Sequence, residues 1–187
     1  MVRTMFRVLA FTGLRKSELL ALQWADLDEV NRTLSVKRIV ARGISSLIVQ
    51  DPKTESSFRT ISIDSRTWEI LKQWRTVQKV RLIKHGQNAH GKNQYVFTNE
   101  DNSFLNPKFL NNNLERILAN HPNLPKMTIH GFRHTHCSLL FDARVEEGAI
   151  KERLGHSSIL TTRNIYDHVT KHRSEDTAQK FENFISF

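Results

Sequence analysis

The segment 130–136, with the sequence His-Gly-Phe-Arg-His-Thr-His, holds the densest group of chemically versatile side chains. His130 and Arg133 are three positions apart, so they share one face of a helix or a tight turn. The other histidines, His134 and His136, are expected to point elsewhere and to serve in packing or capping. An imidazole that exchanges protons near neutral pH beside a guanidinium that binds oxyanions favours chemistry on an anionic substrate.

Further candidates stand in segments far from this one along the chain. Arg15 lies at the entrance of an expected helix, and Glu18 follows one turn later, where it can orient the guanidinium. Lys53 lies in the polar connection between two extended runs. His156 belongs to a Leu-Gly-His-Ser-Ser segment, and Tyr166 follows it ten positions later.

Together these groups could cleave a phosphodiester. Two guanidinium groups bind non-bridging oxygens and stabilise the added charge of a pentacoordinate transition state. The Tyr166 oxygen becomes a nucleophile once a base accepts its proton, and His130 is a candidate for that base. Lys53 is a candidate acid for the leaving 5′ oxygen. We expect neither a metal nor a cofactor, because these cations already neutralise the phosphate.

The apolar periodicity predicts the elements that must position these groups. Helices are expected over 2–11, 17–24, 65–84, 107–119, 130–142, 146–154, 159–169 and 175–185. Extended runs are expected over 33–40, 45–50 and 59–63, and their connections are too short for crossover helices. The expected fold class is therefore α+β and mainly α-helical, with one small three-stranded antiparallel sheet.

Local signals mark several helix ends and one buried face. Ser17 and Asp64 are expected N-caps of the helices that follow them, and Gly155 is expected to end the helix over 146–154. In the longest helix, over 65–84, apolar residues recur every three positions and predict the buried face: Trp68, Leu71, Trp74, Val77 and Val80.

Composition narrows the classes of protein and partner. The chain has 187 residues, of which 39% are hydrophobic and 25% charged, which favours a globular domain over a disordered chain. Lys and Arg number 28 against 19 Asp and Glu, so the net charge is +9 and favours an anionic partner, nucleic acid first. The single cysteine, Cys137, excludes an internal disulfide framework and a cysteine-rich zinc site. No run approaches the roughly 18 apolar residues of a membrane span, so we expect a cytoplasmic protein without a membrane partner.

Five segments carry a resemblance to a known family. They are FTGLRKSELLALQWADLD (11–28), PKTESSFRTI (52–61), IHGFRHTHCSLLF (129–141), ERLGHSS (152–158) and TTRNIYDHV (161–169). Their order and spacing resemble the catalytic domain of tyrosine recombinases, specifically the phage and mobile-element integrases of Gram-positive bacteria. One such segment would be weak support, whereas five in order make a strong match.

The resemblance implies a role for each candidate side chain. Arg15 and Arg133 correspond to the two arginines that clamp the scissile phosphate, and Glu18 to the acidic residue that buttresses Arg15. Lys53 corresponds to the general acid on a hairpin.

The remaining candidates complete the implied machinery. His130 corresponds to a general base or phosphate ligand, and His156 to a histidine that hydrogen-bonds the phosphate. Tyr166 corresponds to the nucleophile that becomes joined to the DNA 3′ phosphate.

The resemblance also implies a function and an organisation. A site-specific recombinase or integrase cleaves and rejoins DNA through a covalent 3′-phosphotyrosyl intermediate, without metal or ATP, to integrate or excise a mobile element or prophage. Its implied partners are double-stranded DNA, further copies in a tetramer, and accessory excision or host DNA-bending factors. Residues 1–187 would form the catalytic domain at the C-terminal part of a longer integrase whose core-binding domain is absent from this chain. The C-terminal tail, 175–187, would dock on a neighbouring protomer through Phe181, Phe184 and Ile185.

Two other readings stay open, two more are disfavoured, and one residue departs from the family pattern. The chain could be a non-catalytic DNA-binding module or an enzyme that relaxes DNA like a type IB topoisomerase. A metal-dependent nuclease is disfavoured because clustered carboxylates are lacking, and a zinc site at His130 and His134 lacks the glutamate of an H-E-x-x-H motif. Arg144 stands at a turn where many relatives have glycine.

Overall fold

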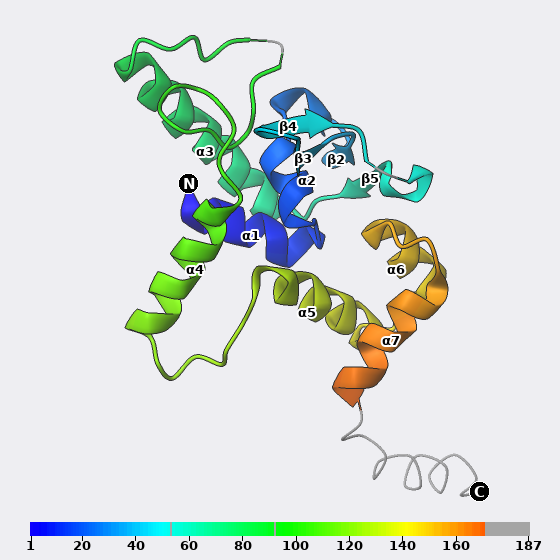
Figure 1. Ribbon diagram of the computed structural model, residues 1–187. Coiled ribbons are helices and arrows are strands. Elements are labelled where there is room, and N and C mark those ends of the chain that lie inside the picture. Colours follow the sequence, from blue (N-terminus) through cyan, green and yellow to red (C-terminus); the bar gives the residue numbers. More distant parts are fainter. Residues whose placement is uncertain (53, 92, 171–187) are drawn as a thin grey trace, which may run out of the picture.

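The computed structural model describes residues 1–52, 54–91 and 93–170, and helix α1 (Val2–Thr12) lies at its centre. This helix packs against α3 (Ser65–Lys84) and α5 (Ile129–Asp142), as Figure 1 shows. Met5, Val8 and Leu9 of α1 are completely buried in the main hydrophobic core. Gly13 ends the helix in the left-handed conformation, at a φ of 68°.

Two small antiparallel sheets lie beside these helices. The first has three strands in the order β1 (Leu27–Asp28), β2 (Thr33–Val36) and β5 (Arg59–Ser62), and the second pairs β3 (Ile39–Arg42) with β4 (Leu47–Gln50). The expected three-stranded antiparallel sheet is thus confirmed, although its strands differ from the three expected runs. The run 33–40 divides between the two sheets.

The division of that run has a local cause. It falls at Lys37 and Arg38, whose side chains both approach the buried carboxylate of Asp26, with Arg38 Nη2 2.6 Å from Asp26 Oδ2. A short 3₁₀ helix, η1 (Trp24–Asp26), presents that carboxylate. Because two side chains turn toward one acceptor, the alternation of a continuous strand is interrupted there.

Helix α2 (Lys16–Ala21) begins two residues earlier than its expected cap implies. Arg15, and not Ser17, occupies the N-cap position, and the Glu18 carboxylate reaches back to accept a hydrogen bond from the Arg15 backbone N–H at 2.7 Å. This is the acidic half of a capping box. The carboxylate therefore outcompetes the Ser17 hydroxyl for the start of the helix.

The expected N-cap of α3 is confirmed, but its expected buried face is only half right. Asp64 accepts a hydrogen bond from the Thr67 backbone N–H at 2.9 Å. The buried face of the helix continues from Trp74 to Gln78 and Leu82, whereas Val77 and Val80 are exposed. Residues spaced by three drift off the face of a helix that has 3.6 residues per turn, and spacing by four compensates.

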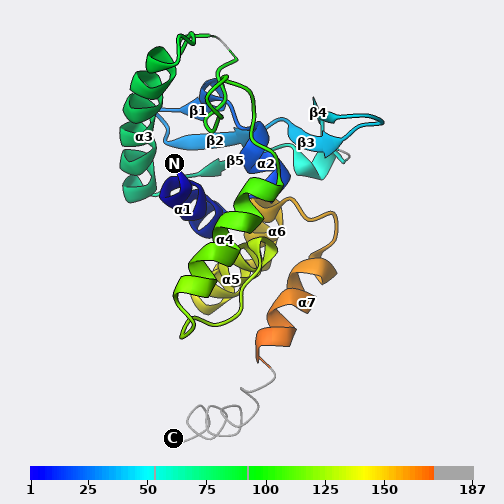
Figure 2. The same cartoon turned by 60° about the vertical axis from the view of Figure 1, so that its left-hand side comes forward.

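The remaining helices form the other half of the molecule. They are α4 (Lys108–Asn120), α5, α6 (Glu147–Leu154) and α7 (Ile159–Thr170). Cys137, Ile150 and Leu154 make a second small core, against which Leu140, Phe141 and Ile165 pack. Burial raises the pKa of the Cys137 thiol to about 11, in keeping with its expected buried place. Figures 1 and 2 both show α7 and α3 at opposite ends of the molecule.

Some expectations lie outside the described residues: Lys53, the helix over 175–185 and the C-terminal tail. Among the described helices, none is both long enough and apolar enough to cross a membrane.

Candidate active site

One cavity of about 550 Å³ brings together most of the expected site residues. It lies where the start of α2, one face of α5, the loop after α6 and the first turns of α7 meet. Its lining residues are Arg15, His130, Arg133, His134, His156, Thr161, Asn164 and Ile165. Segments more than a hundred positions apart therefore contribute to a single strongly cationic pocket.

Arg133 is the most deeply buried member of this cavity, with 1% of its surface exposed. Its Nη1 donates to the carbonyl of Gly13 at 2.7 Å, and its Nη2 donates to the carbonyl of Leu154. Burial, reinforced by the nearby Arg15 charge, lowers the pKa of Arg133 to about 9, so it remains a cation at neutral pH. Two main-chain carbonyls thus hold the Arg133 guanidinium in place, and its positive charge faces the cavity.

Arg15 is fixed in a similar way from the other side. Its Nη1 donates to Glu18 Oε1 at 2.8 Å, and its Nη2 donates to the carbonyl of Gly155 at 3.1 Å. About a third of the side chain is exposed, so the guanidinium still faces solvent. The expected buttressing of Arg15 by Glu18 is present as a hydrogen-bonded ion pair.

A second arginine on Glu18 was not expected from the sequence. Arg59, at the start of β5, donates to Glu18 Oε1 at 3.0 Å and to Oε2 at 2.8 Å. Burial alone would raise the pKa of Glu18, but the hydrogen bonds and charges of Arg59 and Arg15 hold it below its usual value. The only sequence signal for Arg59 is its place in the segment 52–61.

The histidines of α5 divide between the cavity and the core. His130 and His134 both line the cavity, with their rings perpendicular and 4.5 Å apart. The expectation that His134 points elsewhere is wrong, because residues four apart on a helix share a face. Partial burial, followed by the charges of His134 and then Arg133, lowers the pKa of His130.

His136 takes the packing role that was expected for it. Its Nδ1 donates to the Ala10 carbonyl at 3.0 Å, while its Nε2 accepts a hydrogen bond from Arg153 Nε at 3.0 Å. Burial, followed by the Arg153 charge, lowers the pKa of His136 to about 4. This histidine is therefore neutral and helps to join α5, α1 and α6.

His156 follows the left-handed Gly155 and is buried at the wall of the cavity. Its Nδ1 lies 2.8 Å from the hydroxyl of Thr162, which is completely buried on α7. Burial, followed by the charges of Arg133 and Arg15, lowers the pKa of His156 to about 4. Thr162 is a supporting residue that was not expected from the sequence, although its place four positions before Tyr166 puts both on one face of α7.

Tyr166 lies close to the cavity but stacks against α5. Its ring and that of Phe141 are 4.4 Å apart at an angle of 24°. Three other residues of α7, Thr161, Asn164 and Ile165, line the cavity in this conformation. Tyr166, the nucleophile expected from the sequence, thus lies on α7 next to residues that face the pocket.

Comparison with known protein families agrees with this geometry. The model of the phage integrase family matches residues 1–173. The chain belongs to the phage integrase family. The expected resemblance to the catalytic domain of tyrosine recombinases is confirmed.

Relatives within the phage integrase family are longer than this chain. The ICEBs1 integrase of Bacillus subtilis (strain 168) is 30% identical over 183 residues, which cover 98% of this chain and 49% of that protein. A XerC-like tyrosine recombinase of Caldanaerobacter subterraneus subsp. tengcongensis is 37% identical over an alignment of 175 residues, and the match covers 87% of this chain and 44% of that protein. The chain therefore spans about half the length of these relatives.

The solved structure of a transposon integrase has the same fold. The Tn1549 transposon integrase in complex with circular intermediate DNA is 25% identical, with a TM-score of 0.75 over 98% of this chain and 59% of that one. The mainly α-helical α+β architecture with a small antiparallel sheet is thereby confirmed.

Proposed function

We propose that this chain is the strand-cleaving and rejoining centre of a site-specific DNA recombinase or integrase. The observation that carries the proposal is the cavity in which Arg15 and Arg133, each held by main-chain carbonyls, face the same space as His130 and His156. Two fixed guanidinium groups suit the two non-bridging oxygens of a phosphodiester. Family membership supports the same activity.

In the proposed reaction, the Tyr166 oxygen attacks the scissile phosphorus and the bond to the 5′ oxygen breaks. The phenolic proton passes to a base, for which His130 is the candidate, and the leaving 5′ oxygen takes a proton from an acid. Lys53 is the candidate acid, on the strength of the resemblance. Arg15 and Arg133 stabilise the charge of the transition state. The product is a 3′-phosphotyrosyl link, and the reverse reaction rejoins a strand.

His156 is proposed to donate a hydrogen bond to the phosphate. If the Thr162 hydroxyl donates to Nδ1 of the neutral ring, the proton of the imidazole lies on Nε2. A neutral donor there adds no further charge to a pocket that already holds two arginines.

The proposed partner is double-stranded DNA, because the chain carries a net charge of +9 and the related Tn1549 integrase was solved with DNA. Assembly into a tetramer, contact of the C-terminal tail with a neighbouring protomer, and accessory excision or DNA-bending factors are proposed from the family resemblance. Neither a non-catalytic DNA-binding module nor a topoisomerase-like enzyme is favoured, since the family model is that of integrases.

Trapping of the covalent intermediate tests this function. Nicked duplexes tiled across the ends of the DNA element that encodes the chain are incubated with it in EDTA, and the adduct is followed by denaturing electrophoresis. We expect an adduct that Tyr166→Phe abolishes. Tyr95→Phe is the matched control, because Tyr95 is the chain's other tyrosine and its ring packs edge-on against Phe104. Survival of the adduct in Tyr166→Phe would refute the nucleophile, and its loss in EDTA would refute a metal-free reaction.

A further inference from the structure

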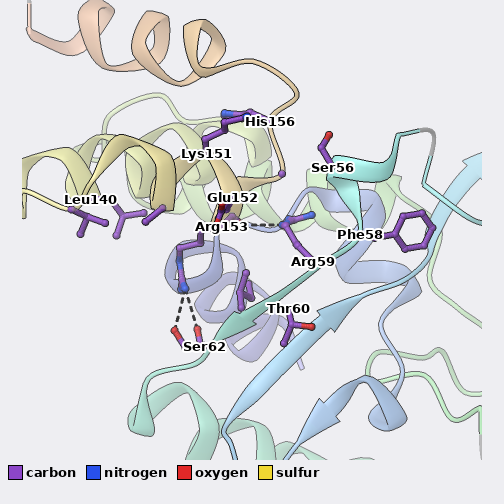
Figure 3. Close-up of a pocket in the computed structure, with 14 residues that line it drawn as sticks. Ser56, Phe58, Arg59, Thr60, Ser62, Leu140, Lys151, Glu152, Arg153 and His156 are labelled. Carbon is purple, nitrogen blue, oxygen red and sulfur yellow. Dashed lines mark hydrogen bonds between the residues drawn. The ribbon is translucent and has the colours of Figure 1, made fainter.

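Arg59 is a buried arginine that contacts the residues supporting Arg15. It does not itself line the candidate active-site cavity. Its side chain is 5% exposed, so DNA cannot reach it directly. In Figure 3 it extends from β5 toward the end of α6, across a separate cavity of about 660 Å³. Burying a guanidinium costs free energy unless hydrogen bonds and ion pairs replace its contacts with water. The partners of Arg59 therefore indicate what its burial achieves.

The first set of contacts saturates Glu18. Glu18 Oε1 accepts from Nη1 of both Arg15 and Arg59, at 2.8 Å and 3.0 Å. Its Oε2 accepts from the Arg15 backbone N–H at 2.7 Å and from Arg59 Nη2 at 2.8 Å. Each oxygen is thus shared by the two arginines, which leaves the carboxylate a single orientation.

The second set of contacts lies at the other support of Arg15, the carbonyl of Gly155. Arg59 Nε donates to the Arg153 carbonyl at 2.8 Å, two residues before that glycine. A Cβ on Gly155 would lie 3.1 Å from Arg59 Cδ and Nη1, so the glycine packs directly on this side chain. Arg59 therefore bonds Glu18 directly and packs against the residue whose carbonyl supports the Arg15 guanidinium.

Charge sharing adds a second consequence. A carboxylate bound to Arg15 alone would neutralise that arginine as a one-to-one ion pair. Because Arg59 competes for the same carboxylate, part of the positive charge of Arg15 stays available to an anion in the cavity.

We propose that Arg59 is a positioning residue for DNA cleavage: it holds Glu18 and the Gly155 carbonyl where they orient Arg15, and it preserves the charge of Arg15 for the scissile phosphate. This inference rests on the proposed function. It assigns to Arg59 an effect on the rate of cleavage that passes through Arg15 and leaves DNA affinity unchanged.

A double-mutant cycle tests the proposal, with adduct formation on the nicked duplex as the rate and a gel shift as the affinity. Arg59→Met is made in the wild-type chain and in Arg15→Lys. We expect Arg59→Met to slow adduct formation by about 10- to 100-fold in the wild-type chain, since small misplacements of a catalytic group have effects of that size. In the Arg15→Lys chain, Arg59→Met should slow the reaction by less than about threefold, because the effect of Arg59 passes through the Arg15 guanidinium, which is already lost.

Arg153→Met is the matched control. Arg153 is a half-buried arginine at the same cavity, but its side chain binds the carbonyls of Phe11 and Ser62 and the ring of His136. Its substitution should change the rate by the same factor in both backgrounds. Arg59→Lys, which keeps the charge but cannot bond both carboxylate oxygens, should be intermediate and serves in the same cycle if Arg59→Met does not fold.

The outcomes separate the two proposals. Equal slowing by the Arg59 substitution in both backgrounds, or an unchanged rate in the wild-type chain, would overturn the positioning role while leaving the recombinase function standing. Absence of any Tyr166-dependent adduct from the wild-type chain would overturn the function itself.

Discussion

Arg133 donates a hydrogen bond of 2.7 Å to the main-chain carbonyl of Gly13, which lies 120 positions earlier in the chain. The acceptor belongs to the backbone, so its direction is set by the conformation of Gly13 and not by a side chain. Gly13 has a φ of 68°, and a Cβ there would lie 2.6 Å from Leu154 Cδ2 and 2.8 Å from His136 Cδ2. The placement of the Arg133 guanidinium therefore depends on the absence of one methyl group.

Gly13→Ala should destabilise the protein and slow cleavage. A left-handed alanine costs about 1 kcal/mol, and the two close contacts should add about 1–3 kcal/mol of overpacking. Gly86→Ala is the control, because Gly86 has a φ of 69° but has no atom within 4 Å of the added Cβ. Urea unfolding of both variants measures the difference, and equal losses of stability would contradict the role assigned to the contacts.

Stability should fall as the pH drops from 7 to 5, in part because of His136. The pKa of His136 is about 4 in the folded protein against 6.5 as its ordinary value, so its stabilising effect is complete above pH 6.5 and is lost toward pH 4. Between pH 7 and 5 this amounts to about 2 kcal/mol for one such histidine. His156, with the same lowered pKa, adds to the slope.

His136→Gln should therefore flatten the pH dependence of the unfolding free energy by about 2 kcal/mol over that range. His121→Gln, at an exposed position, is the control and should retain the wild-type slope. Urea titrations at pH 7, 6 and 5 give the comparison. A His136→Gln slope equal to that of the wild-type chain would refute the assignment.

Phe141→Leu should accelerate formation of the covalent adduct. In the proposed reaction Tyr166 must leave its stack on Phe141 to reach a phosphate in the cavity, and such a stack contributes about 0.5–1.5 kcal/mol. The rate should rise by about two- to tenfold. Phe132→Leu, which removes a stack of α5 on Phe6, is the control and should affect stability only. Slower cleavage by Phe141→Leu would instead show that the stack supports the reactive state.

Arg144→Gly should stabilise the turn between α5 and α6. Arg144 has a φ of 59°, a conformation in which an L-residue is strained by about 1 kcal/mol. After the added freedom of glycine in the unfolded chain is subtracted, the net gain should be about 0.5 kcal/mol. Ala143→Gly, next to it with a φ of −77°, has no strain to relieve and should be destabilising. Loss of stability in Arg144→Gly would contradict the expectation.

Sequence reasoning was most successful where the signal is local. Asp64 caps α3, Gly155 ends α6, and His130 and Arg133 share a face, because each depends only on neighbours along the chain. The order of the five segments placed Arg15 and His156 in the same site, which periodicity alone would not have done.

What escaped prediction depends on contacts between distant segments. The role of Arg59 depends on its contact with Glu18, which lies 41 positions away in the sequence. The carbonyls that hold Arg133 and Arg15 belong to the main chain, so the types of side chain in the sequence do not reveal them. The division of the run 33–40 between two sheets depends on Asp26. The stack of Tyr166 on Phe141 joins α7 to α5, and spacing along the sequence does not reveal it.

The carbonyls that hold Arg133 and Arg15 include those of Leu154 and Gly155, near the end of the described chain. These acceptors are made after both arginines, with Gly155 140 positions after Arg15 and Leu154 21 positions after Arg133. A nascent chain therefore has neither guanidinium in its final place until α6 is made and docked. These two guanidinium groups are therefore among the later parts of the described fold to reach their final places, so the order of translation delays the assembly of the candidate active site.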